Sequence, residues 1–445
     1  MVETNMIFLF ISGIFLLGFF GTIIFRRTKV SDIFFLLIIG FLLGSGLKII
    51  PSAEMTILRS FSDFFGALAL TILMFEGGLH LNFYKVIKEF GKSAGFTILV
   101  FFLSVSLTAI FLHFIFLMPW VYGFLIGSIL GGVSSAVVIP LVKESKAKDK
   151  IKILLTLESA ITDALCVIIV IALVQIILSK TASIQAVTSS IFAAFAIATV
   201  IGAFAGIIWL RVLRDFKVAR EYGYLLTLSF LFLVYVVIQF ANGNGSFGAL
   251  IFGLVLGNGS EILKIFKMKE FSIGSSITMF QAEISLFIKT FFFVYLGIIV
   301  EFVGINLKII LIVIGLFIIA LLARLLAVNI VFSKKKNPSE DREYVASLHA
   351  RGLAAAVLAT YPLIMGINNE FTQIILPISF MIIILTNLST TILFFITERK
   401  VNKNIKIKDD NSNFKYENKI NPDIEKQDSL SILKKELIKN KNDKE

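Results

Sequence analysis

Long apolar runs recur along this chain, and they limit its fold more than any other feature. An α-helix needs about 20 residues to cross ~30 Å of hydrocarbon, and most of the runs reach that length. Residues are 57% hydrophobic and only 16% charged, whereas about 25% are charged in a typical soluble protein. The sequence therefore predicts an all-α protein with about thirteen transmembrane helices, near 5–25, 31–50, 60–80, 91–118, 119–142, 151–179, 185–210, 221–241, 246–258, 281–300, 307–332, 343–366 and 371–397.

Basic residues alternate between the two sides of this arrangement. The even-numbered gaps between spans are poor in them and are flanked by Lys48, Arg59, Lys180 and Lys308. The odd-numbered gaps carry basic stretches such as "RRTK", "KESKAKDKIK" and "KKKNPSEDR". Because positive loops stay in the cytoplasm, the N-terminus is expected outside and the C-terminus in the cytoplasm of a cell membrane. The net charge of +12 then reflects this topology, and no nucleic-acid partner is expected.

The composition changes near residue 398. Residues 1–397 are expected to form one transmembrane domain in the lipid bilayer, and 398–445 a charged, disordered cytoplasmic tail rich in Lys, Asn, Asp and Glu. The lone cysteine, Cys166, lies inside an apolar run, which argues against disulfides and metal clusters. No cofactor is expected.

Seven ionisable residues fall inside the predicted spans, where charge is costly and indicates function: Glu76, Glu158, Asp163, Glu283, Lys289, Arg324 and Arg351. From the helical rise, Asp163 lies about 18 Å deep, near the bilayer centre. Glu158 and Arg324 have opposite charges at a similar depth, so we expect them to form a structural ion pair. Asp163 is then the uncompensated carboxylate.

The helical positions around Asp163 support a division of roles. Five residues rotate about 500° along a helix, so Glu158 and Asp163 point roughly 140° apart. Ser159 and Asp163 share one face at i and i+4. A hydroxyl and a carboxylate at mid-membrane are hard oxygen ligands that suit Na⁺ or a proton. The alternative, that Asp163 only joins helices by hydrogen bonding, is less favoured because other membrane charges lie at overlapping depths.

Two of the spans are poor continuous helices. The fifth, "GFLIGSILGGVSSAVVIPLV", contains Gly131-Gly132 and Pro140, and the twelfth, "YVASLHARGLAAAVLATYPLIMG", contains Arg351-Gly352 and Pro362. Broken helices of this kind expose backbone groups to ions at the midplane of transporters. Small residues in spans also occur for close packing alone. The separation by seven spans favours two inverted repeats with two broken, crossing helices.

Five motifs in order resemble those of NhaP-type sodium/proton antiporters in the monovalent cation:proton antiporter superfamily. They are "LMFEGGLHLN" (73–82), "LESAITD" (157–163), "FIKTFFFVYLG" (287–297), "LLARLLAV" (321–328) and "ARGLAAAVLA" (350–359). "LESAITD" is similar to the family pattern E-S-x-x-N-D. The resemblance implies a homodimer with alternating access, and a transporter in place of an enzyme.

The resemblance also implies roles for individual residues. Asp163 matches the transport carboxylate, at which Na⁺ and H⁺ compete, and Ser159 a side-chain ligand, so Na⁺ is expected at these two residues. Glu76 matches an indirect, water-mediated ligand. Glu158 matches the acid that pairs with a basic residue, here Arg324. Arg351, which matches the arginine of the twelfth span, and Lys289 are expected in supporting roles.

The sequence departs from the family pattern at two places. Thr162 stands where the family has asparagine, and the T-D-P motif of the fifth span is absent. Ser134 or Ser135 takes the place of its acid, and the sequence does not decide between them. All three hydroxyls are candidates for cation and proton binding.

These observations predict exchange of Na⁺ (or Li⁺) for H⁺ through competition at Asp163. With one free central carboxylate, the exchange is expected to be electroneutral. The alternative within the same superfamily is K⁺/H⁺ antiport, because hydroxyl-rich sites without the second acid resemble the potassium-selective branch. A gated cation channel is less favoured, since no filter motif is visible, and no catalytic motif indicates an enzyme.

Overall fold

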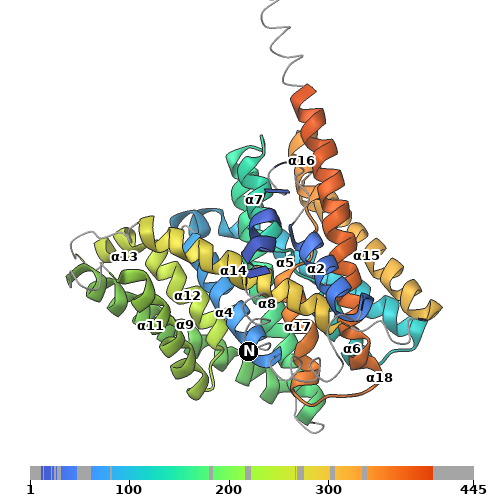
Figure 1. Cartoon of the computed structure of the whole chain (residues 1–445), viewed down its shortest axis with the longest axis horizontal. Helices are drawn as coiled ribbons and strands as arrows, with labels where there is room; N and C mark the ends of the chain where they lie inside the picture. Colours follow the sequence, from blue (N-terminus) through green and yellow to red (C-terminus); the bar gives the residue numbers. More distant parts are fainter. Residues whose placement is uncertain are drawn as a thin grey trace, which may run out of the picture. The chain divides into compact units, whose positions relative to one another are not determined.

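The computed structural model describes residues 32–47, 62–80, 83–179, 184–215, 222–265, 275–300, 306–332 and 338–403, with Lys267 and some residues between 12 and 27. Within these residues the regular structure is entirely helical (Figure 1), which confirms the predicted class. The helices are α2 (Asp32–Phe41), the π-helix η1 (Leu42–Gly46), α4 (Ser62–His80), α5 (Phe83–Phe116), α6 (Trp120–Ile129), α7 (Ser135–Glu144), α8 (Asp149–Ser179), α9 (Ile184–Asp215), α11 (Gly223–Phe240), α12 (Gly245–Gly257), α13 (Gly259–Ile265), α14 (Ser275–Ile299), α15 (Leu307–Val331), α16 (Ser339–Ser347), α17 (Leu353–Ile364) and α18 (Glu370–Gln373). α18 begins the final apolar span, Glu370–Lys403.

Many of these helices are long and apolar enough to cross a membrane. The described residues contain seven such helices, or eight when α12 and α13, which meet at a bend of 80°, count as one broken span. Shorter apolar helices occupy other predicted spans, among them Asp32–Gly44 and Phe64–His80. A multi-pass membrane protein is therefore confirmed, while the count of thirteen stays a prediction. The predicted span 5–25 lies largely outside the described residues, as does the predicted tail beyond residue 403.

Both predicted helix breaks are present. The fifth predicted span consists of α6 and α7, separated by the unwound stretch 130–134, and the twelfth of α16 and α17, separated by 348–352. We call these stretches the first and the second break. Pro140 and Pro362 lie inside the later half-helices, so the breaks fall at the glycine-containing segments that precede them.

Glycines allow two pairs of helices to pack at close range. A side chain at Gly40 of α2 would collide with the backbone of Val294 in α14, and one at Gly78 of α4 with the backbone of Leu250 in α12. Residue numbers rise in the same direction in both pairs, so the partners run parallel. The pairs join predicted span two to ten and span three to nine. If the second repeat follows the first by seven spans, span two corresponds to span nine and span three to span ten. The pair formed by spans two and ten is then equivalent to the pair formed by spans nine and three.

Helix α8 occupies a central position. It packs against α5, α6, α7, α16 and α17, and also against α9. In Figure 1 the helices α9, α11 and α12 form one group of neighbours, and α5, α6 and α15 form another. The acidic residues that the sequence indicates on α8 are therefore placed among both half-helix pairs. The contacts described below lie within the compact unit that ends at Phe394.

Candidate ion-binding site

The two carboxylates of α8 have different surroundings. Glu158 is completely buried, with a relative exposure of 0%, whereas Asp163 keeps part of its surface accessible. An ion can reach only a group that has accessible surface. The difference in exposure separates a structural acid from a candidate ligand.

Glu158 forms an ion pair with Arg324 of α15. The pair joins Oε1 of Glu158 to Nη1 of Arg324, and both side chains are 1% exposed. The Nε of Arg324 also donates to the backbone oxygen of Val345 near the end of α16, over 2.7 Å. The guanidinium lies over the ring of Phe96, 5.3 Å from its centroid. The structure thus brings together the two residues that the sequence places at one depth.

Asp163 instead meets a neutral hydroxyl. The Oγ of Ser135 donates to Oδ2 of Asp163 over 2.5 Å, and the backbone N–H of Ser135 also donates to this carboxylate. Ser135 is the first residue of α7, and a helix N-terminus favours a negative charge through its free N–H groups and its dipole. Among the described residues, no lysine, arginine or histidine forms an ion pair with Asp163.

The two serines of the first break have separate environments. Ser135 contacts Asp163, whereas the Oγ of Ser134 is buried without a hydrogen-bond partner in the described structure. The Ser134 side chain lies against Gly352 in the second break, at a place where any larger residue than glycine would clash. The backbone N–H of Ser134 donates to the oxygen of Ala350 over 2.8 Å. The contact with Asp163 therefore belongs to Ser135, and Ser134 lies where the breaks cross.

Thr162 joins α8 to the first break. Its Oγ1 accepts a bond of 3.0 Å from the backbone N–H of Val133 and donates to the oxygen of Ser159 over 3.1 Å. A side chain at Gly132 would collide with the sulfur of Cys166, so the unwound chain rests directly on α8. Both of these hydrogen bonds of Thr162 are to backbone groups, and they hold the first break beside Asp163.

Arg351 binds the carbonyl groups that the first break exposes. Its Nη1 donates to the oxygen of Gly132 over 2.6 Å and to that of Gly131 over 3.3 Å. Its Nη2 donates to the Oγ of Ser104 on α5 over 3.3 Å. The side chain of this arginine is buried. These partners could not be predicted from the sequence, because two of them are backbone atoms.

The second break is held by the final span. The N–H of Arg351 donates to Oγ1 of Thr386 over 3.0 Å, and the Nδ2 of Asn387 donates to the oxygen of Arg351 over 2.7 Å. The ring of His349 contacts the Oγ of Ser389 over 2.8 Å. Sequence analysis missed these polar residues, since hydroxyl and amide side chains in an apolar span carry no distinctive pattern.

The other predicted site residues lie on three helices. Ser159 is buried one turn before Asp163, and its hydroxyl donates to the oxygen of Thr156 over 3.0 Å. Glu76 is half-buried on α4, and its carboxylate interacts electrostatically with the side chain of Tyr224 of α11. Lys289 of α14 forms an ion pair of 2.5 Å with Asp32 at the start of α2. The sequence had not identified Asp32, because it lies at the edge of a predicted span.

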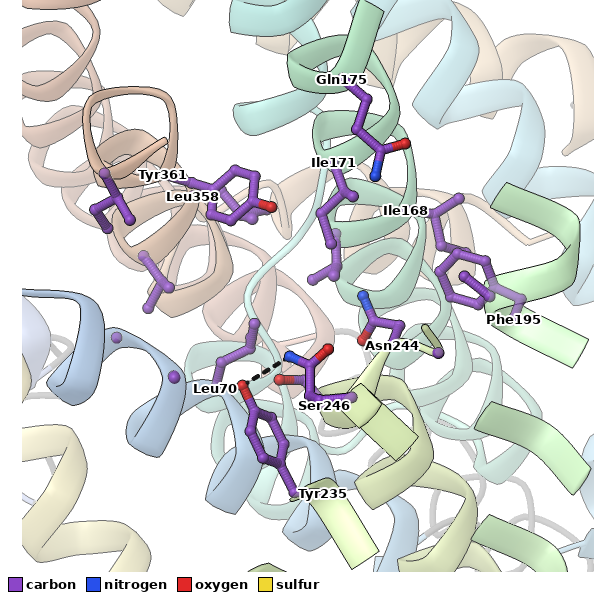
Figure 2. A pocket seen from close by; sticks show the side chains of 18 of the residues that line it. Leu70, Ile168, Ile171, Gln175, Phe195, Tyr235, Asn244, Ser246, Leu358 and Tyr361 are labelled. Carbon is purple, nitrogen blue, oxygen red and sulfur yellow. Dashed lines mark hydrogen bonds between the residues drawn. The ribbon is translucent and has the colours of Figure 1, made fainter. Parts of the chain in front are cut away.

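A cavity of about 440 Å³ begins one helical turn beyond Asp163. Val167, four residues after Asp163 on α8, is among its lining residues. Figure 2 shows side chains from several helices around it, including Gln175 of α8, Tyr235 of α11 and Tyr361 of α17. The Nε2 of Gln239 donates to the hydroxyl of Tyr235 over 3.0 Å. None of the described residues that line the cavity is charged.

Comparison with known proteins places this geometry in a family. Residues 14–399 match the model of the sodium/hydrogen exchanger transmembrane family. The K(+)/H(+) antiporter NhaP of Alkalimonas amylolytica is 23% identical over 392 residues, which are 87% of this chain and 65% of that protein. The probable Na(+)/H(+) antiporter 2 of Methanocaldococcus jannaschii is 25% identical over 61% of this chain and 64% of the relative. The chain thus spans less than two thirds of either relative.

A solved structure shows the same fold. The sodium proton antiporter MjNhaP1 from Methanocaldococcus jannaschii superposes with a TM-score of 0.72, covering 88% of this chain and 99% of that one, at 20% identity. The family match extends over most of the chain, including both breaks and the acidic helix between them. This chain therefore belongs to the sodium/hydrogen exchanger family of multi-pass membrane proteins.

Proposed function

We propose that the chain exchanges Na⁺ for H⁺ across the cell membrane, with both ions competing for Asp163. The observation that carries this proposal is the environment of that carboxylate. It keeps accessible surface, and it accepts a hydrogen bond from the neutral Ser135 hydroxyl at the start of α7. A carboxylate without a fixed counter-charge at mid-membrane is stable only with a proton or a cation bound.

Ser135 and Asp163 supply the chemistry of the exchange. When Asp163 is protonated it is neutral, and when it loses the proton its oxygens bind a hard cation. The Ser135 hydroxyl donates to the carboxylate and also has lone pairs for the cation. Ser159, one turn away on α8, is proposed as a further ligand in a state of the cycle that exposes its hydroxyl, which is buried and bonded to Thr156 in the described structure. Glu76 is proposed as an indirect ligand. One proton then leaves for each cation that enters, so the exchange is electroneutral.

The buried pair of Glu158 and Arg324 supports the site as an ion pair between α8 and α15. Its charges cancel each other, and Arg324 also binds the carbonyl of Val345. We assign it a structural role. Lys289 has its partner in Asp32, so its proposed supporting role is to join α14 to α2.

The cavity beside Val167 is proposed as one access route to Asp163. It is lined by residues 242–244 of the loop between α11 and α12, which the charge pattern places outside. Alternating access requires a second route from the basic, cytoplasmic side. In this orientation the N-terminus lies outside and the C-terminus in the cytoplasm. We further propose a homodimer that acts as a transporter without enzymatic activity and needs no ligand besides the transported ions.

Everted membrane vesicles test the proposal. An acridine dye reports the pH gradient, and addition of Na⁺ should reverse its quenching when the wild-type protein is present. Asp163→Asn keeps the shape but exchanges no proton, so this variant should give no signal at normal abundance. Glu370→Gln, the same change at an exposed residue of α18, is the matched control and should match the wild type. A signal from Asp163→Asn would exclude the mechanism.

K⁺/H⁺ exchange is the second candidate. A named K(+)/H(+) antiporter is among the relatives that cover most of this chain, and Ser135 provides a hydroxyl where the family pattern has a second acid. The same vesicles answer this question when K⁺ and Li⁺ replace Na⁺. Dequenching by K⁺ alone would select the second candidate.

Electroneutrality can be tested separately. One uncompensated charge that crosses 100 mV changes the free energy by about 2.3 kcal/mol. Reconstituted protein should therefore give the same Na⁺-driven pH change with or without a voltage clamp by valinomycin and K⁺. A rate that rises several-fold under an imposed potential would show that a second group carries charge.

A further inference from the structure

The first break has two ends with opposite polarity, and each end has its own partner. At the amide end, Ser135 N–H and hydroxyl meet the Asp163 carboxylate. At the carbonyl end, the oxygens of Gly131 and Gly132 lie in the unwound stretch beyond Ile129, the last residue of α6. Exposed carbonyls at a half-helix end are the groups that coordinate cations in transporters with broken helices.

Arg351 already occupies that carbonyl end. Its guanidinium donates to Gly132 over 2.6 Å and to Gly131 over 3.3 Å, and the residue is 2% exposed. It is fixed from both sides, since its Nη2 contacts Ser104 and its backbone is bonded to Thr386 and Asn387. An arginine stays protonated in proteins. A permanent positive charge therefore lies where a second cation would otherwise bind.

We propose that Arg351 is a specificity-determining positioning residue, which substitutes for a cation at Gly131 and Gly132 and so confines the transported ion to Asp163. The inference rests on the proposed antiport function and deepens it. It explains how a broken helix with two polar ends can bind a single monovalent cation. It also gives the release of that cation a physical basis, because the carbonyl ligands that would hold it more tightly are taken.

Loss of the charge should make cation binding tighter and release slower. Arg351→Gln keeps hydrogen-bond donors but removes the charge, so one or both carbonyls become available to the cation. We expect the KM for the cation to fall at least five-fold at the alkaline end of the pH range, and the maximal rate to fall with it. A residue that only stabilises the fold would, when replaced, lower the abundance of the protein or its maximal rate without lowering the KM for the cation.

The experiment uses full-length protein in liposomes, with whichever of Na⁺ and K⁺ drives wild-type exchange. Arg351→Lys retains the charge with a less suitable geometry, so its rate should fall while its KM stays within two-fold of the wild type. Lys148→Gln removes an exposed cation that pairs with Asp341 over 3.1 Å, away from both breaks in sequence, and is the matched control.

Two results would overturn the role of Arg351. One is an unchanged or raised KM in Arg351→Gln at normal abundance. The other is a five-fold or larger fall of the KM in Arg351→Lys, which retains the charge and therefore decides the question even if Arg351→Gln does not fold. Wild-type protein that moves no protons with any cation would instead refute the antiport function itself, so the two failures are distinguishable.

Discussion

The two helix breaks are alike at their carbonyl ends and different at their amide ends. A buried arginine binds there in both cases: Arg351 to two carbonyls just after α6, and Arg324 to the carbonyl of Val345 in the last turn of α16. At the amide end of the first break, α7 begins against Asp163. At the second break, α17 begins at Leu353 after Gly352, which provides no side-chain cap, and Ser134 packs on Gly352. Both breaks thus have an arginine at their carbonyl end, but only at the first does the following half-helix begin against an acid, the residue at which we propose that ions exchange.

This comparison predicts different consequences for the residues around each break. Residues at the amide end of the first break should affect ion affinity. Arg351, which holds the carbonyl end of the first break, should affect ion affinity as well. The other residues that hold the second break should affect stability first.

The largest expected effect on stability concerns the ion pair of Glu158 and Arg324, which is joined to α16 by the bond from Arg324 to Val345. Glu158→Ala leaves Arg324 buried and unpaired, which costs about 3–5 kcal/mol in soluble proteins. The melting temperature in detergent should fall strongly, and the double variant Glu158→Ala/Arg324→Ala should recover part of the loss. Lys148→Ala, which breaks an exposed pair, should cost no more than about 1 kcal/mol. Simple addition of the two losses would show that the buried partners do not interact.

The serines of the first break provide a sharper comparison. Ser135→Ala removes a hydrogen bond to a charged group, worth about 1.5–3 kcal/mol. The half-saturating cation concentration should then rise roughly 10- to 100-fold. Ser134→Ala removes a hydroxyl that has no hydrogen-bond partner in the described structure, so the same transport assay should show little change. Equal effects of the two substitutions would mean that the ion lies at the crossing point and not at Asp163.

The smallest effect is expected at the support of the second break. Thr386→Val removes the acceptor of the Arg351 N–H, a neutral hydrogen bond worth about 0.5–1.5 kcal/mol. Thermal unfolding should begin a few degrees earlier, while the KM for the cation stays the same. A changed KM would show that the second break takes part in ion binding.

Sequence reasoning located the elements that depend on length and composition. Apolar runs located the spans, and Gly131-Gly132 and Arg351-Gly352 located both breaks within a few residues. Partners were harder to find. The choice between Ser134 and Ser135 depends on one residue of register in an unwound segment, which no periodicity describes. The partners of Arg351 are backbone carbonyls, and those have no signature in a sequence.

Packing decided the remaining features. Asp32 lies at the beginning of a span, where a charge costs little free energy. The sequence therefore did not indicate its ion pair with Lys289, which joins α2 to α14. Thr162 seemed a candidate ligand because of its place before Asp163, and the structure shows its hydroxyl bonded to Val133 N–H. Whether Ser159 and Glu76 contact the ion stays a prediction.

Proton release during cation binding tests the central claim most directly. Competition at one carboxylate is reciprocal, so each cation that binds must displace about one proton at a pH where Asp163 is protonated. Purified wild-type protein in a weakly buffered detergent solution should release protons when Na⁺ or K⁺ is added, and fewer protons for each bound cation as the pH rises and Asp163 loses its own proton. Asp163→Asn should release none. Proton release from that variant, or cation binding by the wild type without release at any pH, would contradict the account.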